Sequence, residues 1–271
     1  MILLRLPSRL AYVAGALTLL ATWAAVLLDA PRASAATQVS QNWSGYVVTG
    51  DRFRRVSGSW VVPKPSCQNH FKTYSDSWVG LGGFKDGAQS LEQTGTSADC
   101  TSAGKQRYSV WYELLPAAAV TIKMKVRPGD KMTGTIAVSG TQVRIVLRNR
   151  TRDTKFSTTK HMSSPDLSSA EWILEAPSDC DQLGNCRPLP LANFGKIPFT
   201  SAQVTTSNGH TASISRAGAK VTRLRLSDPA GGEAIPSGLS SDGSAFSVHY
   251  RASGASMRSA KAFRQIAPAA R

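Results

Sequence analysis

Past residue 40, the chain alternates short apolar segments with polar turns. The apolar segments are rich in Val, Ile, Trp, Tyr and Thr, and Gly, Pro, Asp or Ser separates them. Residues of the first kind favour strands, and those of the second kind favour turns. No sustained helical repeat of about 3.6 residues interrupts this alternation. The pattern predicts strands at 45–48, 57–62, 77–81, 108–115, 120–126, 131–138, 142–148, 171–174, 203–206, 221–226 and 246–250.

Many short strands at close spacing are typical of an antiparallel all-β fold, either a two-sheet β-sandwich or a barrel. The segments RPGD at 127–130 and SG at 139–140 have the composition of hairpin connections. All-β domains of about 210 residues commonly form one unit. We therefore expect residues 37–251 to form a single domain.

The first 36 residues have the composition of a targeting segment. Arg5 and Arg9 precede an uncharged apolar run at 10–28, and the small residues ASAA follow at 33–36. A signal peptidase accepts this order of basic, apolar and small residues. We expect residues 1–36 to be a signal peptide and the remaining chain to be secreted. The alternative is an uncleaved membrane anchor, since about 19 apolar residues can just span a bilayer.

Four cysteines lie in the part of the chain that we expect to be exported: Cys67, Cys100, Cys180 and Cys186. An even number in an exported chain predicts two disulfides, for which three pairings exist. We favour Cys180 with Cys186, because the Gly and Asn between them permit a tight reversal, and this leaves Cys67 for Cys100. A metal site is the weaker alternative, because no CxxC motif is present.

The sequence is strongly basic, with a net charge of +15 that becomes +13 when residues 1–36 are removed. The basic residues are scattered through the predicted strands, so the charge does not favour a nucleic-acid partner. A secreted protein that lies near acidic polymers, or that acts in an acidic medium, would explain the charge equally well. Residues 252–271 contain four basic residues and no acid. We expect a flexible tail there, with weak association with an anionic cell surface or a short amphipathic helix as alternatives.

Several common hydrolase motifs are absent. The sequence contains no HExxH zinc motif, no GxSxG elbow and no glycine-rich phosphate loop. Its four histidines lie far apart, and although a Ser/His/Asp triad does not depend on sequence order, nothing local supports one. No acidic cluster resembles a calcium loop.

Polar side chains are instead embedded in aromatic segments: WVGLGG at 78–83, LEQTGT at 91–96, WYELLP at 111–116 and AEWILEAP at 170–177. Because alternate residues of a strand share a face, Glu171 and Glu175 lie opposite Trp172, and Trp111 lies beside Glu113. Burial beside aromatic rings raises a carboxyl pKa towards values useful for catalysis. The alternative is that the glutamates are solvated and the tryptophans fill the core.

Paired carboxyls also characterise glycosidases. Glu171 and Glu175 are four residues apart, which at about 3.3 Å per residue separates their backbones by roughly 13 Å. Retaining and inverting glycosidases need roughly 5 to 9.5 Å between the carboxyls. A cross-strand pair such as Glu113 with Glu175 remains an alternative. A β-sandwich glycoside hydrolase or carbohydrate-binding protein therefore stays open.

In their order and spacing, these segments resemble the eqolisins, the glutamic peptidases of family G1. The resemblance extends from NWSG at 42–45 to about Tyr250, and its specific parts are LEQTG at 91–95 and AEWILE at 170–175. WVG at 78–80, WYE at 111–113 and the segment 190–199 support it. The resemblance implies a concanavalin A-like sandwich of two antiparallel sheets with a substrate groove over one curved face.

The resemblance also implies a catalytic pair, Gln93 and Glu175, that drives a water molecule onto a peptide bond. Trp78, Trp111 and Glu113 match residues that line or support the family's active site, and we expect them to contact substrate. No metal or cofactor is implied. We therefore expect a secreted, monomeric endopeptidase that acts on polypeptides.

Two positions depart from the family pattern. Gly82 and Ser109 stand where the family often has Asp. Fewer acids near Glu175 tend to lower the pKa of its carboxyl. We therefore expect an acidic pH optimum that is less extreme than in the family.

Overall fold

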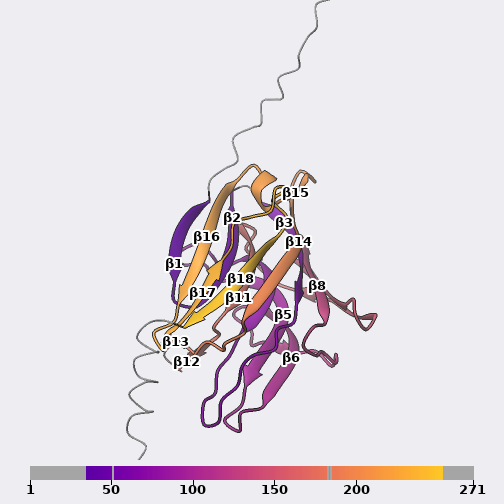
Figure 1. Ribbon diagram of the computed structural model, residues 1–271. Coiled ribbons are helices and arrows are strands. Elements are labelled where there is room, and N and C mark those ends of the chain that lie inside the picture. The colour runs from indigo at the N-terminus through magenta and orange to yellow at the C-terminus, as the bar shows by residue number, and fades with distance from the viewer. Residues whose placement is uncertain (1–34, 51, 182, 184, 253–271) are drawn as a thin grey trace, which may run out of the picture. The chain divides into compact units, whose positions relative to one another are not determined.

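The computed structural model describes residues 35–50, 52–181, 183 and 185–252 (Figure 1). Within these ranges the regular structure is strand, apart from one 3-10 helix, η1 (Ile214–Arg216). The strands are β1 (Ala36–Ser40), β2 (Trp43–Thr49), β3 (Phe53–Val61), β4 (Asp76–Gly82), β5 (Leu91–Cys100), β6 (Gln106–Leu114), β7 (Val120–Thr121), β8 (Lys131–Ser139), β9 (Gln142–Asn149), β10 (Thr154–His161), β11 (Ser169–Glu175), β12 (Ser178–Cys180), β13 (Cys186–Pro188), β14 (Lys196–Thr206), β15 (Thr211–Ser213), β16 (Lys220–Ser227), β17 (Gly232–Pro236) and β18 (Phe246–Ala252).

The strands in which apolar and polar residues clearly alternate were predicted correctly from the sequence. In β9, Val143, Ile145 and Leu147 are fully buried, and the residues between them are more exposed. The turn at 139–140 joins β8 to β9 as expected. The prediction at 120–126 is wrong beyond residue 121, because only β7 pairs with a neighbouring strand there. The turn at 127–130 therefore leads into β8 without joining two strands.

The sequence pattern missed β5, although this strand carries Gln93. Its residues LEQTGTSADC are polar or small, and nearly all of them are buried. A strand covered on both faces does not alternate between polar and apolar positions. The strands β1, β10, β12, β13, β15 and β17 were missed as well.

One hydrogen-bonded sheet contains all strands except the β12–β13 hairpin. Its main path runs β10-β9-β8-β3-β14-β18-β17-β16-β2-β11-β4-β5-β6-β7, and neighbours along this path are antiparallel. The strand β15 pairs with β14, and β1 lies parallel to β16. The fold is therefore a large, mainly antiparallel all-β structure, as predicted.

Distant parts of this path pack against each other through side chains. A Cβ on Gly58 of β3 would lie 2.6 Å from the Trp172 ring of β11, and one on Gly134 of β8 would lie 2.8 Å from Val79 of β4. The larger apolar cluster includes Trp172 and Leu174. A second cluster consists of Val47, Trp78, Leu91, Trp111, Ile173 and Leu224. Alternate residues of β11 thus enter different clusters, which confirms the predicted assignment of its faces.

Two disulfides are present, with the favoured pairing. Cys67 is bonded to Cys100 at a Cα–Cα distance of 5.3 Å, and Cys180 to Cys186 at 4.0 Å. The first bond ties the long segment between β3 and β4 to the end of β5. It therefore stabilises the strand that carries Gln93.

The predicted signal peptide and basic tail, at 1–36 and 252–271, lie outside the described residues except where they adjoin the domain. These two predictions stay predictions. In the described part of the chain, no helix is long and apolar enough to cross a membrane.

Candidate active site

Glu175 lies at the end of β11, between β2 and β4. Its carboxyl accepts hydrogen bonds from Asn42 Nδ2 at 3.2 Å and from Trp78 Nε1 at 2.8 Å. Burial raises the pKa of Glu175 to about 7, the side chains of Trp43, Trp78 and Asn42 lower it, and the Glu113 carboxyl raises it. A carboxyl with a pKa near neutrality can both accept and donate a proton, as general acid–base catalysis requires.

Gln93 lies in β5 and is 5% exposed. Its Nε2 donates a hydrogen bond to Glu113 Oε2 at 2.7 Å. Because the amide nitrogen carries two hydrogens, one N–H remains for another acceptor. The amide oxygen Oε1 is buried and has no hydrogen-bond partner among the residues that the structure describes. The side chain therefore has both a donor and an acceptor to offer a bound molecule.

Glu113 holds the Gln93 amide in place from β6. Burial raises the pKa of Glu113, while the hydrogen bonds from Gln93 and the Ala119 backbone lower it. An ionised Glu113 only accepts hydrogen bonds, so it binds the nitrogen end of the Gln93 amide. The oxygen end, Oε1, therefore points away from Glu113.

Strand register places all these residues on one face of the sheet, because opposed residues in neighbouring strands project to the same side. Three rows cross β11, β4, β5 and β6: Glu175, Asp76, Ser97 and Ser109; then Ile173, Trp78, Gly95 and Trp111; then Glu171, Gly80, Gln93 and Glu113. We call this surface the carboxyl face. Glu175 and Gln93 share it, in the first and third rows.

Trp78 lies between the acid and the amide. Its nitrogen contacts Glu175, while a Cβ on Gly80, the register partner of Gln93, would lie 3.0 Å from its ring atom Cζ3. A Cβ on Gly95 would lie 2.7 Å from Trp78 Cβ and 3.0 Å from Trp111 Cζ2. Because these two glycines have no side chain, the indole rings fit in the space above them.

The structure places the five predicted site residues in two groups, one around Glu175 and one around Gln93. Glu175 contacts Trp78, Gln93 contacts Glu113, and Trp111 shares an apolar cluster with Trp78. Among the described residues, no hydrogen bond joins Gln93 directly to Glu175.

Two residues of the site were not singled out from the sequence. Asn42 precedes β2 and reaches Glu175 across 133 positions of the chain. Asp76 begins β4 directly opposite Glu175. The spacing of Asp76 two residues before Trp78 would have placed it on the same face, had the start of the strand been known.

The two positions that lack the family's Asp have acids from other segments nearby. Gly82 has φ of +79°, and a Cβ there would lie 2.5 Å from Asp166 Cβ. Asp166 Oδ2 accepts the Gly83 N–H at 3.0 Å. Ser109 stands in the row of Asp76. The substitutions at Gly82 and Ser109 therefore do not leave this part of the sheet without acids.

The carboxyl pairs considered for a glycosidase are not adjacent in register. Glu171 and Glu175 occupy the third and first rows of one strand, and Glu171 is fully buried. Glu113 and Glu175 also occupy different rows, with β4 and β5 between their strands. Neither pair is opposed in strand register, which weakens the glycosidase interpretation.

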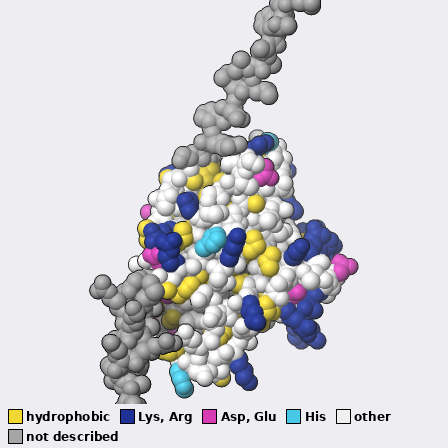
Figure 2. Space-filling view, in the orientation of Figure 1, with side chains coloured by type: hydrophobic (Ala, Val, Ile, Leu, Met, Phe, Trp, Pro, Cys, Tyr) yellow, Lys and Arg dark blue, Asp and Glu magenta, His cyan; other side chains and the backbone are white. Residues whose placement is uncertain are grey.

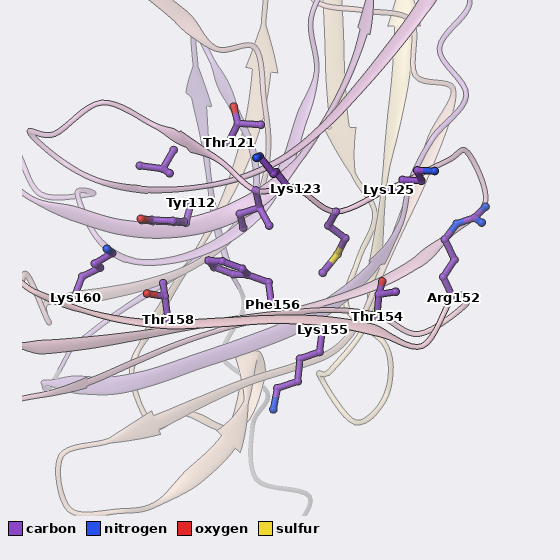
Figure 3. A pocket seen from close by; sticks show the side chains of 13 residues that line it. Tyr112, Thr121, Lys123, Lys125, Arg152, Thr154, Lys155, Phe156, Thr158 and Lys160 are labelled. Atoms are coloured by element: carbon purple, nitrogen blue, oxygen red, sulfur yellow. The ribbon is translucent and has the colours of Figure 1, made fainter.

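A separate cleft of about 770 Å³ lies between β10 and the segment that follows β6 (Figure 3). Tyr112 and Phe156 stack within it at a centroid distance of 6.0 Å. Lys123, Lys125 and Lys160 are among its lining residues, which include no acid. The cleft therefore lacks a carboxyl for acid–base chemistry, and Tyr112 points away from the carboxyl face that its neighbour Trp111 joins.

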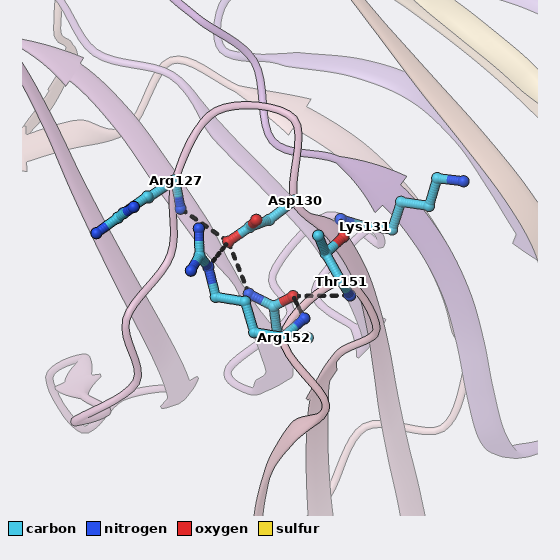
Figure 4. Close-up of polar contacts among 6 residues, drawn as sticks. Arg127, Asp130, Lys131, Thr151 and Arg152 are labelled. Atoms are coloured by element: carbon cyan, nitrogen blue, oxygen red, sulfur yellow. Dashed lines mark hydrogen bonds and ion pairs between the residues drawn. The ribbon is translucent and has the colours of Figure 1, made fainter.

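Asp130 fixes one end of this cleft through Arg152 (Figure 4). Its Oδ2 accepts hydrogen bonds from Arg152 Nε at 2.7 Å, Asn149 Nδ2 at 2.8 Å and the Arg127 backbone N–H at 2.9 Å. Burial opposes ionisation, but these bonds outweigh it and lower the pKa of Asp130. The network ties the turn before β8 to the end of β9. Across the described residues, no three His, Cys, Asp or Glu side chains are grouped to hold a metal ion.

Comparison with known proteins identifies one family. The model of the Peptidase A4 family matches residues 41–250. Aspergillopepsin-2 of Aspergillus niger is 30% identical over an alignment of 194 residues that covers 62% of this chain and 66% of that protein, just under two thirds. Scytalidopepsin B of Scytalidium lignicola is 30% identical over 198 residues, 70% of this chain and 72% of that protein.

Solved structures agree with this. Scytalido-glutamic peptidase with a peptide-based transition state analog superposes with a TM-score of 0.64 at 25% identity, over 79% of this chain and 100% of that one. The aspergilloglutamic peptidase of Aspergillus niger gives a TM-score of 0.54 at 25% identity, over 66% and 99%.

Proposed function

The chain belongs to the peptidase A4 family, the eqolisins, and we propose on this basis that it is an endopeptidase whose Gln93 and Glu175 activate water against a peptide bond. One observation carries the proposal. Glu175, with a pKa raised to about 7, lies on the same face as Gln93, whose amide keeps a free donor and a free acceptor. The relatives' names support it, since the solved scytalido-glutamic peptidase binds a peptide-based analogue.

Glu175 is the group that moves protons. When ionised, it accepts a proton from the water whose oxygen attacks the carbonyl carbon. The carboxyl, now protonated, then donates this proton to the leaving amine nitrogen as the C–N bond breaks. Trp78 and Asn42 stabilise the ionised form, and burial stabilises the protonated form. The group is therefore able to alternate between the two.

Gln93 is the group that orients water and stabilises charge. Its Oε1 accepts a hydrogen bond from the water, and its remaining N–H donates to the carbonyl oxygen as negative charge builds there. Loss of one such donor typically raises the barrier by about 2.7 to 4 kcal/mol. Because an amide is neutral at every pH, Gln93 adds no charge beside Glu175.

We also infer that the domain is a two-sheet, concanavalin A-like sandwich and that substrate lies across the carboxyl face. The packing of β3 and β8 against β11 and β4 supports the first inference. Trp111 supports the second, because it keeps 8% of its surface exposed on this face and an indole ring beside a polar site binds apolar side chains of a peptide. Trp78 is fully buried and contributes through its hydrogen bond to Glu175.

The working range that we propose is near neutrality, which is less acidic than the sequence led us to expect. Because the pKa of Glu175 is about 7, its ionised form becomes scarce as the pH falls below this value, and activity falls with it. Initial rates measured from about pH 2 to about pH 9 check this range. A maximum in strong acid would contradict it.

We further propose that residues 1–36 direct export and are removed, that the secreted protein acts on polypeptides as a monomer, and that residues 252–271 associate weakly with anionic cell surfaces. The mass of the protein recovered from culture medium tests the first point, and its sedimentation the second. A chain ending at residue 251 that is retained on cell surfaces as well as the full chain would contradict the third.

The central test is hydrolysis of an unfolded protein by the purified mature chain, with pepstatin and a chelator present. We expect cleavage in the presence of both, and a loss of about 10²- to 10⁴-fold in Glu175→Gln. Asp179→Asn is the matched control, because Asp179 is exposed and lies opposite Arg187 in the separate β12–β13 hairpin. Undiminished cleavage by Glu175→Gln would overturn the assignment, and glycan binding without cleavage would favour the carbohydrate alternative.

A further inference from the structure

Asp76 and Glu175 form a carboxyl pair on the carboxyl face. They are register partners at the ends of β4 and β11. Directly opposed residues of antiparallel strands have Cβ atoms about 4.5–5.5 Å apart and project to the same side. Both side chains are only partly exposed. Two carboxyls so close together in a poorly solvated place resist ionising together, so over a wide pH range the pair carries one negative charge.

The surroundings of the two carboxyls decide where that charge rests. Glu175 receives N–H groups from Asn42 and Trp78. The groups that act most strongly on Asp76 are one donor, the Ser97 hydroxyl, and three acids: Asp99 on β5, Glu175 on β11 and Glu113 on β6. N–H donors stabilise an anion and neighbouring acids destabilise one. The negative charge therefore rests on Glu175 and the proton on Asp76.

We propose that Asp76 is a positioning residue that keeps a proton opposite Glu175 and thereby sets the alkaline limit of activity. This proposal rests on the peptidase function proposed above. While Asp76 is neutral, Glu175 is the sole anion of the pair and acts as the base. Once Asp76 also ionises, two negative charges face the carbonyl oxygen that gains charge as water attacks, and their repulsion raises the barrier.

The electrostatics of Asp76 agree with this geometry. Burial raises the pKa of Asp76 well above its usual value, the Ser97 hydroxyl lowers it, and Asp99, Glu175 and Glu113 raise it further. Arg107 is the cation of this group, and it acts on Asp99. Asp76 thus keeps its proton at pH values where an ordinary aspartate is ionised.

The test is the pH dependence of kcat/KM in the wild type and in Asp76→Asn. Asparagine cannot ionise, so we expect the alkaline limb to move up by at least about one pH unit while the acid limb, which reports Glu175, stays in place. Movement of the acid limb instead would mean that Asp76 carries the charge, and the proposal would be wrong. Movement of neither limb would refute it too, although the peptidase function would stand.

Two further variants act on Asp76 without removing it. Ser97→Ala removes the hydroxyl that stabilises the Asp76 anion, so the alkaline limb should move up. Asp99→Asn removes a negative charge beside Asp76, so the limb should move down. Opposite movements support the proposal even if Asp76→Asn fails to fold. Shifts of the alkaline limb in the same direction in both variants, or no shift in either, contradict it. A purely structural role of Asp76 does not predict shifts in opposite directions.

A titration that does not depend on activity separates this proposal from the peptidase function. Carbon NMR of the Glu175 carboxyl should show two transitions in the wild type, its own and that of Asp76, and one in Asp76→Asn. If the wild type cleaves no polypeptide, the proposed function fails while the titration still locates the proton. A single transition at Glu175 in the wild type would refute the pair.

Discussion

Among single residues, Trp78 makes the shorter of the two hydrogen bonds to the Glu175 carboxyl. Its N–H donates to Glu175 Oε2 and lowers the pKa of that carboxyl. In Trp78→Phe the donor is lost, so the pKa of Glu175 rises and the acid limb of kcat/KM moves to higher pH. We expect a shift of about one pH unit, since a hydrogen bond to a charged group contributes about 1.5–3 kcal/mol.

Trp60→Phe is the matched control for this change. Trp60 is also buried, and its N–H donates to Thr96 in β5, whose side chain points away from the carboxyl face. The substitution removes the same group at a comparable packing cost and leaves the surroundings of Glu175 intact. A shift of the acid limb in both variants would show that the effect comes from loosened packing and not from the lost donor.

At the scale of elements, the Cys67–Cys100 bond secures the end of β5. It closes a loop with a sequence separation of 33, whereas Cys180–Cys186 spans 6. By loop entropy, we expect removal of the first bond to cost about 3 to 4 kcal/mol of unfolding free energy and removal of the second about 2 kcal/mol. Urea unfolding of the two double Cys→Ala variants measures the difference. A larger loss for the shorter loop would contradict this ranking.

The strands also show what alternation in the sequence can and cannot reveal. The faces of β11 were assigned correctly, because Trp172 and Glu175 alternate in a sequence that is apolar on one side. The strand β5 was missed because its two faces are both covered, so its buried polar residues resemble a loop in the sequence. The residue Gln93 was nonetheless identified through the resemblance to the eqolisins.

For the whole molecule, buried acids predict greater stability in acid. Glu92 and Glu171 are fully buried, burial raises the pKa of Glu92 to about 8, and burial raises the pKa of Glu171 well above its ordinary value. In the unfolded chain both ionise near pH 4.5. Above that pH the folded state binds more protons than the unfolded state, so the unfolding free energy falls as pH rises towards the folded pKa.

We expect this fall to reach about 1.4 kcal/mol per pH unit for each carboxyl. Unfolding free energies measured at intervals between about pH 4 and about pH 8 give the slope. Glu92→Gln and Glu171→Gln should each flatten it, because glutamine does not ionise. A stability that rises over this range would show that these carboxyls are ionised in the folded protein.

On the scale of the whole molecule, the basic side chains are spread over the surface. Figure 2 shows Lys and Arg side chains in several separate groups over the face drawn, with uncharged surface between them. This agrees with the scattered basic residues of the sequence and with its net charge of +15. A spread of this kind keeps a protein soluble and favours anionic surroundings without defining one binding stripe.

The sequence by itself determined the all-β class and the faces of β11 and favoured the cysteine pairing that is present, because each of these depends on neighbours within a few residues or on a count. Only the tertiary structure decided that Asp76 lies opposite Glu175, that Trp78 lies between the acid and Gln93, and that Asn42 reaches the same carboxyl. These contacts follow from the register between strands far apart in the chain. A shift of one residue in that register would turn every side chain to the other face, and no local pattern specifies it.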